Sequence, residues 1–205
     1  ANNPRFAQID PFNRLLWRAN IRRLEFEPLR DSILAMGGEL DRTVGGRAVN
    51  LAGEPGAGRT RGLGKAAGEL RPHGAYSTRR TVYGYIDRAN LAEMFNHFDF
   101  ASPEMPTGKR YETIVPQQAL FLMNSPFVRV QSQILSRRTT PTPARPLHGC
   151  VDELHRLLFG RPAEPDEHRL AEEFMRAGDS AIKSGEAWEE YVQALLLSNE
   201  FAYVD

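Results

Sequence analysis

The sequence contains a single cysteine, Cys150, so no disulfide can form within the chain, and cysteine usage gives no indication of a redox compartment. No apolar run approaches the roughly 20 residues that a membrane-spanning helix needs. The chain also lacks net charge, because its 26 basic and 26 acidic residues cancel. Overall charge therefore gives no case for a nucleic acid or an acidic membrane surface as the partner.

Several sequence motifs that indicate a cofactor or a catalytic site are absent as well. The sequence has no CxxCH, so this chain binds no covalent haem, and no GxSxG that would indicate a hydrolase nucleophile. His148 and His155 fall on one helical face, but no thiolate or third ligand accompanies them, so we expect no metal site. No basic-then-apolar leader opens the chain, and its first residues resemble the interior of a longer protein.

The remaining composition is that of a soluble globular protein, with 41% hydrophobic and 25% charged residues over 205 positions. Charge is unevenly distributed: residues 42–80 hold eight basic and two acidic residues, whereas residues 151–205 hold thirteen acidic and five basic residues. We interpret this as a basic loop and a solvated acidic helix face.

The N-terminal third predicts helices and then a loop. Asp10 and Pro11 are typical of a helix start, and the apolar spacing predicts a helix to about Glu27, with the arginines at 14, 18 and 22 on one stripe. Pro28 should kink or restart this helix, which Gly37-Gly38 would end. Residues 45–76 form a glycine-rich insertion.

Within this insertion, Gly53-Glu-Pro-Gly-Ala-Gly-Arg-Thr60 resembles a phosphate-binding loop. Arg59 stands where that loop needs a lysine, no good helix former follows, and no later strand ends in an acid that would hold Mg²⁺. We therefore interpret the segment as a basic glycine-rich loop.

The centre of the chain combines a short β element with helices. Residues 81–86 are β-branched and aromatic and predict a short strand, and Asn90-x-x-Glu93 is a capping-box pattern. Pro116 predicts a helix start with Leu120 and Met123 facing inward, and Ser125-Pro126 predicts the start of the next helix.

The predicted fold is mainly α: an irregular helical domain with one short β element and a C-terminal helical bundle. The helical core should span residues 1–138, a stiff proline-rich linker residues 139–146, and the bundle residues 147–205. Apolar spacing predicts helices from Leu147, from Pro165 and around Trp188 in the bundle.

Polar residues around the central elements are the candidate binding site. They are Arg80, Asp99, Arg110, Gln118 and Asn124. Arg80–Asp99 or Arg110–Asp99 is expected to form a buried ion pair that ties the strand to the helices. The alternative is a polar pocket in which the arginines and amides bind an anionic or hydroxyl-rich ligand.

These residues also carry a family resemblance. The chain resembles planctomycete-specific domain one, a bacterial family of unknown function, through a paired arginine before a tyrosine-bearing segment, then Phe-Asp, an arginine-rich turn and a T-x-x-P-x-QAL-x-L-x-N helix. The matching residues are Arg79-Arg80-Thr-Val-Tyr83, Phe98-Asp99, Arg110 and Thr113 to Asn124, with Arg22-Arg23-Leu24-Glu25 upstream and Phe159-Gly160-Arg161-Pro162 downstream.

The resemblance implies a C-terminal module of a larger extracytoplasmic, periplasmic or exported protein. Haem would then belong to an upstream cytochrome c-like domain that this chain lacks, and the chain is expected to begin partway into the family domain. We expect a non-catalytic binding or scaffold module whose partner is another domain of the parent protein, a polysaccharide or a redox protein. The alternative is part of an enzyme that acts on extracellular polysaccharide or of a haem-dependent redox enzyme.

A glycosidase needs two carboxylates about 5–10 Å apart, and the central candidates are Asp87 and Asp99 with Glu104 or Glu112. A solvent-open pair would favour the enzyme. Carboxylates bound to Arg80 and Arg110 would favour the module.

Overall fold

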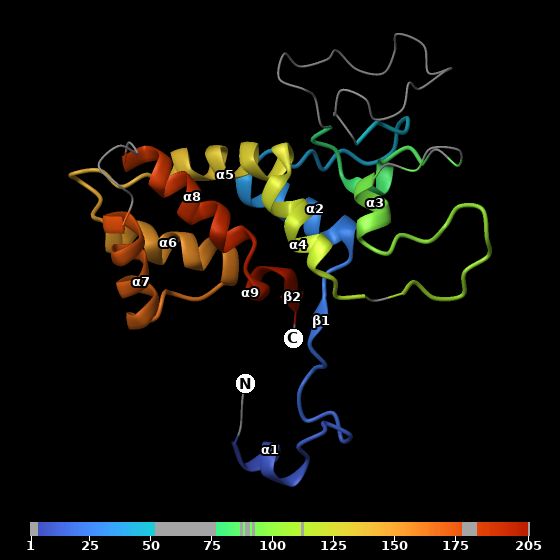
Figure 1. Cartoon of the computed structure of the whole chain (residues 1–205), viewed down its shortest axis with the longest axis horizontal. Coiled ribbons are helices and arrows are strands. Elements are labelled where there is room, and N and C mark those ends of the chain that lie inside the picture. Colours follow the sequence, from blue (N-terminus) through green and yellow to red (C-terminus); the bar gives the residue numbers. More distant parts are fainter. Residues whose placement is uncertain are drawn as a thin grey trace.

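The computed structural model of the chain describes residues 4–51, 77–86, 88, 91, 93–111, 113–177 and 184–204. Its helices are α1 (Pro4–Ile9), α2 (Phe26–Gly37), α3 (Glu93–His97), α4 (Pro116–Asn124), α5 (Pro126–Thr139), α6 (Leu147–Phe159), α7 (Pro165–Ala177), α8 (Ser184–Leu196) and α9 (Asn199–Ala202). Strands β1 (Arg22–Arg23) and β2 (Tyr203–Val204) pair antiparallel, so the segment before α2 and the segment after α9 meet in a short sheet. The predicted mainly α class is confirmed (Figure 1).

Proline fixes several of the helix starts as predicted. Pro116 and Pro126 occupy the first turns of α4 and α5, where a missing backbone donor costs nothing. Gly38 ends α2 with φ 79°, a left-handed conformation in which its N–H and that of Glu39 bond back to carbonyls of the last turn. Pro28 is the third residue of α2, in the first turn, where its missing N–H breaks no helical hydrogen bond, so it does not kink the helix.

The predicted helix from Asp10 to Glu27 is wrong, and with it the proposed arginine stripe. Residues 11–12 and 14–15 form turns and residues 17–18 a bend, because the Asp10 carboxylate accepts the backbone N–H groups of Arg14 (2.9 Å) and Leu15 (2.7 Å). Asn13 and Leu16 adopt left-handed conformations with φ of 52° and 53°. Side chains that bond the local backbone compete with helix formation, and the apolar core of the described residues includes no residue of this segment.

The predicted strand over residues 81–86 is also wrong. Thr81–Tyr83 form a 3₁₀ helix, and only Gly84 makes an isolated bridge, to Val49. The β element lies instead at β1 and β2, which the sequence analysis did not predict. Asn90, of the capping-box pattern, and the glycine-rich motif over residues 53–60 fall outside the described residues.

One apolar core joins the elements on both sides of the proline-rich segment. It extends from Phe26, Leu29 and Ile33 of α2 through Val128 and Leu135 of α5 to the helices of the C-terminal part, whose buried members include Val151, Leu154, Trp188 and Val192. Between α5 and α6 the chain makes a tight turn closed by paired backbone bonds between Thr142 and Arg145, so this segment is not the extended linker expected.

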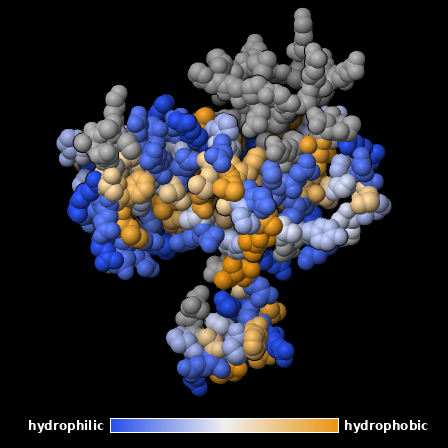
Figure 2. All heavy atoms as spheres, in the orientation of Figure 1, coloured by the Kyte–Doolittle hydropathy of each residue, from blue (hydrophilic) through white to orange (hydrophobic). Residues whose placement is uncertain are grey.

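Residues 4–21 project from the helical body as an arm, which Figure 1 shows below the helices. The arm has its own small contact between Phe6 and Trp17, whose ring centroids are 6.3 Å apart. Its other large apolar side chains are exposed, with Phe12 83% and Leu15 78% accessible. Figure 2 shows apolar atoms on the arm and at its junction with the body.

Within the part of the chain that the structure describes, no helix has both the length and the apolar character needed to cross a membrane.

Candidate functional site

Gln118 is the buried polar residue of α4. It is 5% exposed, whereas Leu120 and Met123, predicted to face inward, are 55% and 57% exposed. The inward face of α4 instead carries Phe121 and Leu122, which pack against the core. The side-chain amide of Gln118 donates to the carbonyl of His97 (2.9 Å), and its oxygen accepts a hydrogen bond from Nη1 of Arg23.

Asp99 lies beside Gln118 and holds three further donors. Its carboxylate accepts the N–H (2.9 Å) and the hydroxyl (2.7 Å) of Thr113, and Nη2 of Arg23 lies 3.2 Å from Oδ2. The backbone of Asp99 is left-handed, with φ 57°, a conformation that Asp and Asn tolerate better than most residues. We call Arg23, Asp99, Thr113 and Gln118 the Asp99 cluster.

The ion pair expected at Asp99 therefore exists with a different arginine. Both proposed pairs, Arg80–Asp99 and Arg110–Asp99, are wrong, because Arg23 from β1 occupies that position. Arg23 was not among the predicted site residues, although it lies in one of the segments that match the family pattern. Its guanidinium also lies over the ring of Phe98, 5.7 Å from the centroid, so the cluster fastens β1 to α3 and α4.

Arg110 is held by two glutamates at the start of α2. Its guanidinium contacts Glu25 (2.8 Å) and Glu27 (2.9 Å) and lies over the ring of Phe100, 4.7 Å from the centroid. Hydrogen bonding to Glu27 is the main cause that raises the pKa of Arg110. The long connection between α3 and α4 is thereby attached to α2.

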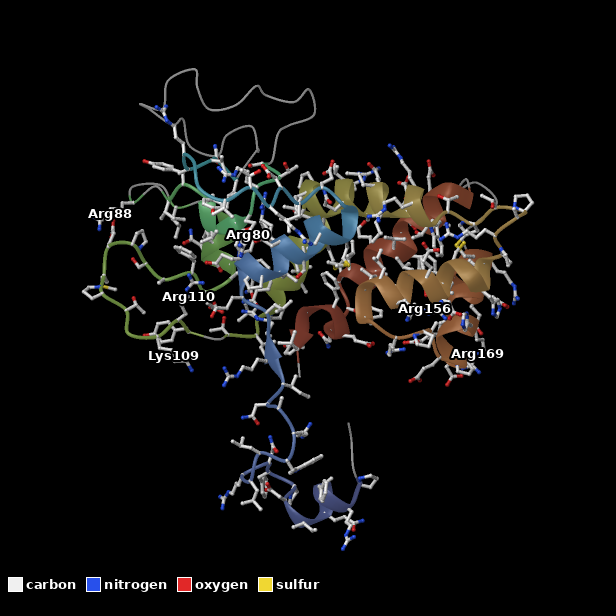
Figure 3. All side chains as sticks on the ribbon, turned by 180° about the vertical axis from the view of Figure 1, so that it is seen from behind. Arg80, Arg88, Lys109, Arg110, Arg156 and Arg169 are labelled. Carbon is white, nitrogen blue, oxygen red and sulfur yellow. The ribbon has the colours of Figure 1, made fainter. Side chains whose placement is uncertain are left out.

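Arg80 precedes the 3₁₀ helix Thr81–Tyr83 and contacts α2 one turn beyond Glu27; Figure 3 labels Arg80 and Arg110. Its Nε lies 3.6 Å from Asp31, and its side chain remains 52% exposed. The other oxygen of Asp31 accepts the N–H (2.7 Å) and hydroxyl (2.6 Å) of Thr81. Asn124 is separate from all of these, because it is exposed and its amide donates to the carbonyl of Leu120 within α4.

Two further arginines organise the same region: Arg79, which belongs to the paired-arginine motif, and Arg30, which was missed as a candidate. Arg30, 3% exposed, donates to the carbonyls of Ser77 and Arg79 and to the hydroxyl of Thr81 (3.2 Å). Arg79 donates to backbone carbonyls of residues 43–47. The signal for Arg30 was its position between Leu29 and Ile33 on the buried face of α2.

The carboxylates proposed for glycoside hydrolysis do not form an open pair among the described residues. Asp99 is engaged in its cluster, and Glu104 is exposed on the connection between α3 and α4. Asp87 and Glu112 lie outside the described residues.

A second polar cluster lies in the C-terminal part, around Arg161. Its guanidinium makes paired contacts of 2.7–2.8 Å with both Glu167 of α7 and Glu200 of α9. Nδ1 of the fully buried His155 lies 3.3 Å from Glu167, and burial lowers the pKa of that imidazole. The Arg161 hydrogen bond lowers the pKa of Glu167 to about 2. No group of three or more His, Cys, Asp or Glu in the described ranges is arranged to hold a metal ion.

Comparison with known families identifies a family to which the chain is similar. The family model described as a protein of unknown function, DUF1553 (PSD1), matches residues 1–175. No curated protein and no solved structure matches the chain.

Proposed function

The chain belongs to the PSD1 family of unknown function (DUF1553), and from its geometry we propose that it is a non-catalytic binding or scaffold module. The observation that carries the proposal is the state of the carboxylates around α2. Glu25 and Glu27 are bound to Arg110, Asp31 to Arg80 and Thr81, and Asp99 to Arg23 and Thr113. Polar groups bound to one another in this way fix the packing of elements and are not free for proton transfer.

The enzyme alternative has less support from the same region. A general acid or nucleophile needs a carboxylate that can reach a substrate and change its protonation state. Each carboxylate around α2 would first have to leave a guanidinium, which stabilises its charged form. We propose that this module lies beside the catalytic or redox part of a larger extracytoplasmic protein, as the family resemblance implies, and that haem belongs to that other part.

The arm provides a surface for a partner within such a protein. Residues 4–22 contain four arginines, at 5, 14, 18 and 22, and a single acid, Asp10, which is buried among the turns. Exposed apolar side chains lie between these arginines. A basic and apolar segment fits a partner surface that is acidic and apolar, and we propose another domain of the parent protein in this role. A polysaccharide or a redox protein is the alternative partner.

Hydrogen–deuterium exchange on the full-length parent protein tests this function. Amides of residues 4–21 should exchange more slowly in the parent than in the isolated chain, because a docked domain would cover the arm. The amides of α5 provide the internal control, since they are in the core of both samples. Equal exchange of the arm in the two samples would refute docking, and turnover of a polysaccharide by the isolated chain would refute the non-catalytic assignment.

A further inference from the structure

An open cleft of about 490 Å³ lies between α2 and the two chain segments around residues 40–42 and 80–82. Its walls carry two arginines, two carboxylates and a serine, together with aliphatic side chains. The residues used below are Glu27, Asp31, Ser32, Arg42, Arg80 and Val82.

The local backbone places Arg42 and Arg80 next to each other. Asp41 and Arg79 form a parallel bridge, and the N–H of Asp41 donates to the carbonyl of Thr78 (2.9 Å). Successive side chains of an extended segment point to opposite faces, and bridged residues share a face. Arg79 accordingly turns to the carbonyls of residues 43–47, and the following residues, Arg42 and Arg80, both line the cleft.

These two guanidinium groups retain most of their binding capacity. Arg42 is exposed, and within the described ranges no side chain or carbonyl pairs with it. Arg80 has one contact, to Asp31 at 3.6 Å, and half of its side chain is open to solvent. Arg80 is thus compensated in part by Asp31, while the guanidinium of Arg42 has its donors available for an anion, and the forked donors of arginine match a carboxylate.

The opposite wall is suited to hydroxyl groups. Glu27 and Asp31 are one helical turn apart on α2. Both Thr81 donors use Oδ1 of Asp31, whereas Oδ2 of Asp31 and the two Glu27 oxygens each retain acceptor capacity beyond their contact with an arginine. Ser32, the residue after Asp31, also lines the cleft, and its hydroxyl adds a donor and an acceptor. Val82, 67% exposed, offers an aliphatic surface against which a sugar ring can pack.

We propose that this cleft binds an acidic saccharide of the uronic acid type, with the carboxylate of the sugar between Arg42 and Arg80 and its hydroxyl groups on Glu27, Asp31 and Ser32. The site deepens the proposed function, on which it rests, because it gives the binding module a class of ligand. Neutral saccharides lack the group that the two arginines bind, so they should bind far more weakly.

Calorimetric titration of the chain with trigalacturonic acid tests the site, with maltotriose and inorganic sulfate as comparison probes. Removing either arginine should weaken trigalacturonate binding by about tenfold or more, since each variant, Arg42→Ala or Arg80→Ala, deletes a charge-assisted pair. Arg137→Ala removes an exposed arginine of α5 that does not line the cleft, and it should leave the affinity unchanged. Thermal melting of each variant checks that the fold is intact. We expect the Arg80→Ala variant to melt close to the wild type, because the contact between Arg80 and Asp31 is solvent-exposed and stabilises little.

The possible results separate the site from the function on which it rests. If trigalacturonate at millimolar concentration gave no heat, or if the Arg42→Ala variant bound it as tightly as the wild type, the proposed saccharide site would be wrong. The proposed binding or scaffold function would still stand. Equal binding of sulfate would overturn the saccharide assignment, because a free anion would then suffice. Shortened oligosaccharides in the titration cell would overturn the non-catalytic function while leaving the site.

Discussion

Replacing Asp99 with alanine should destabilise the protein by about 3 kcal/mol. Arg23, only 16% exposed, would lose its carboxylate partner and keep only the Gln118 oxygen. Loss of such a charge-assisted bond costs about 2 kcal/mol. The left-handed backbone at φ 57° adds about 1 kcal/mol, since alanine tolerates this conformation less well than aspartate. The freed Thr113 donors are exposed and return to water, so they add little.

Two other substitutions at this position separate the two contributions. Asp99→Gly loses the ion pair but relieves the backbone, so it should cost about 2 kcal/mol. Asp99→Asn keeps the backbone preference and part of the hydrogen bonding to Thr113, and its cost should come from the lost charge. Glu104→Ala is the matched control, because Glu104 is an exposed carboxylate on the same connection and should change stability by less than about 0.5 kcal/mol.

Thermal unfolding followed by circular dichroism measures these differences. For a chain of this size 1 kcal/mol corresponds to about 2–4 °C, so Asp99→Ala should melt about 6–12 °C below the wild type. A double-mutant cycle with Arg23→Ala should show that the two single costs are not additive. An Asp99→Ala variant that melts with the wild type would refute the view that this cluster fastens β1 to the helices.

Three further perturbations test other parts of the structure. Because burial lowers the pKa of His155 below its usual value, the unfolded chain takes up a proton more readily as pH falls below about 6.5. Stability to urea should therefore decline in that direction, and less so in His155→Leu. The carboxylate of Glu167, whose pKa Arg161 lowers to about 2, stabilises the fold above about pH 4.5 and loses this effect as pH falls towards 2; Glu167→Gln should flatten that decline. Gly37→Ala would place a Cβ against the buried Gln131 oxygen of α5 and should lower stability by about 1–3 kcal/mol in urea titrations, whereas unchanged stability would contradict the close approach of α2 and α5.

Elements whose start or end is fixed by local chemistry could be predicted from the sequence. Pro116, Pro126 and Pro165 begin α4, α5 and α7, and Gly38 ends α2, because the fixed φ of proline and the left-handed freedom of glycine act on the backbone directly. The apolar spacing from Leu147 similarly predicted α6. These signals require no knowledge of the rest of the fold.

The arm shows where apolar spacing alone is insufficient. Leu15 and Leu16 have helical spacing with their neighbours, yet both are exposed in turns that Asp10 and Asn13 close with their side chains. An amphipathic helix gains most of its stability from the surface it packs against. Since the apolar core of the described residues includes none of residues 10–21, the local hydrogen bonds of Asp10 and Asn13 determine the conformation.

The candidate site illustrates a different limit, which concerns pairing. Asp99, Arg110 and Gln118 are recognisable from the sequence as polar residues with a specific role, and the structure places Asp99 and Gln118 together. The sequence could not select the partner of Asp99, because Arg23, Arg80 and Arg110 carry the same group and differ only in where the backbone places them. The antiparallel pairing of β1 with β2 positions Arg23, a contact between chain segments about 180 residues apart that leaves no periodic signal in the sequence.

The same reasoning explains why Arg80 remains available for a ligand. Arg23 pairs with Asp99, and Arg110 pairs with the glutamates at the start of α2. Arg80 contacts only one carboxylate oxygen of Asp31, because Thr81 donates to the other oxygen. The arginine motif therefore divides by position: the members near β1 and the start of α2 fasten the elements together, and the member that shares a face with Arg42 points into the cleft. If the division is correct, the Arg23→Ala variant should lose stability, and the Arg80→Ala variant should keep its stability and lose ligand affinity.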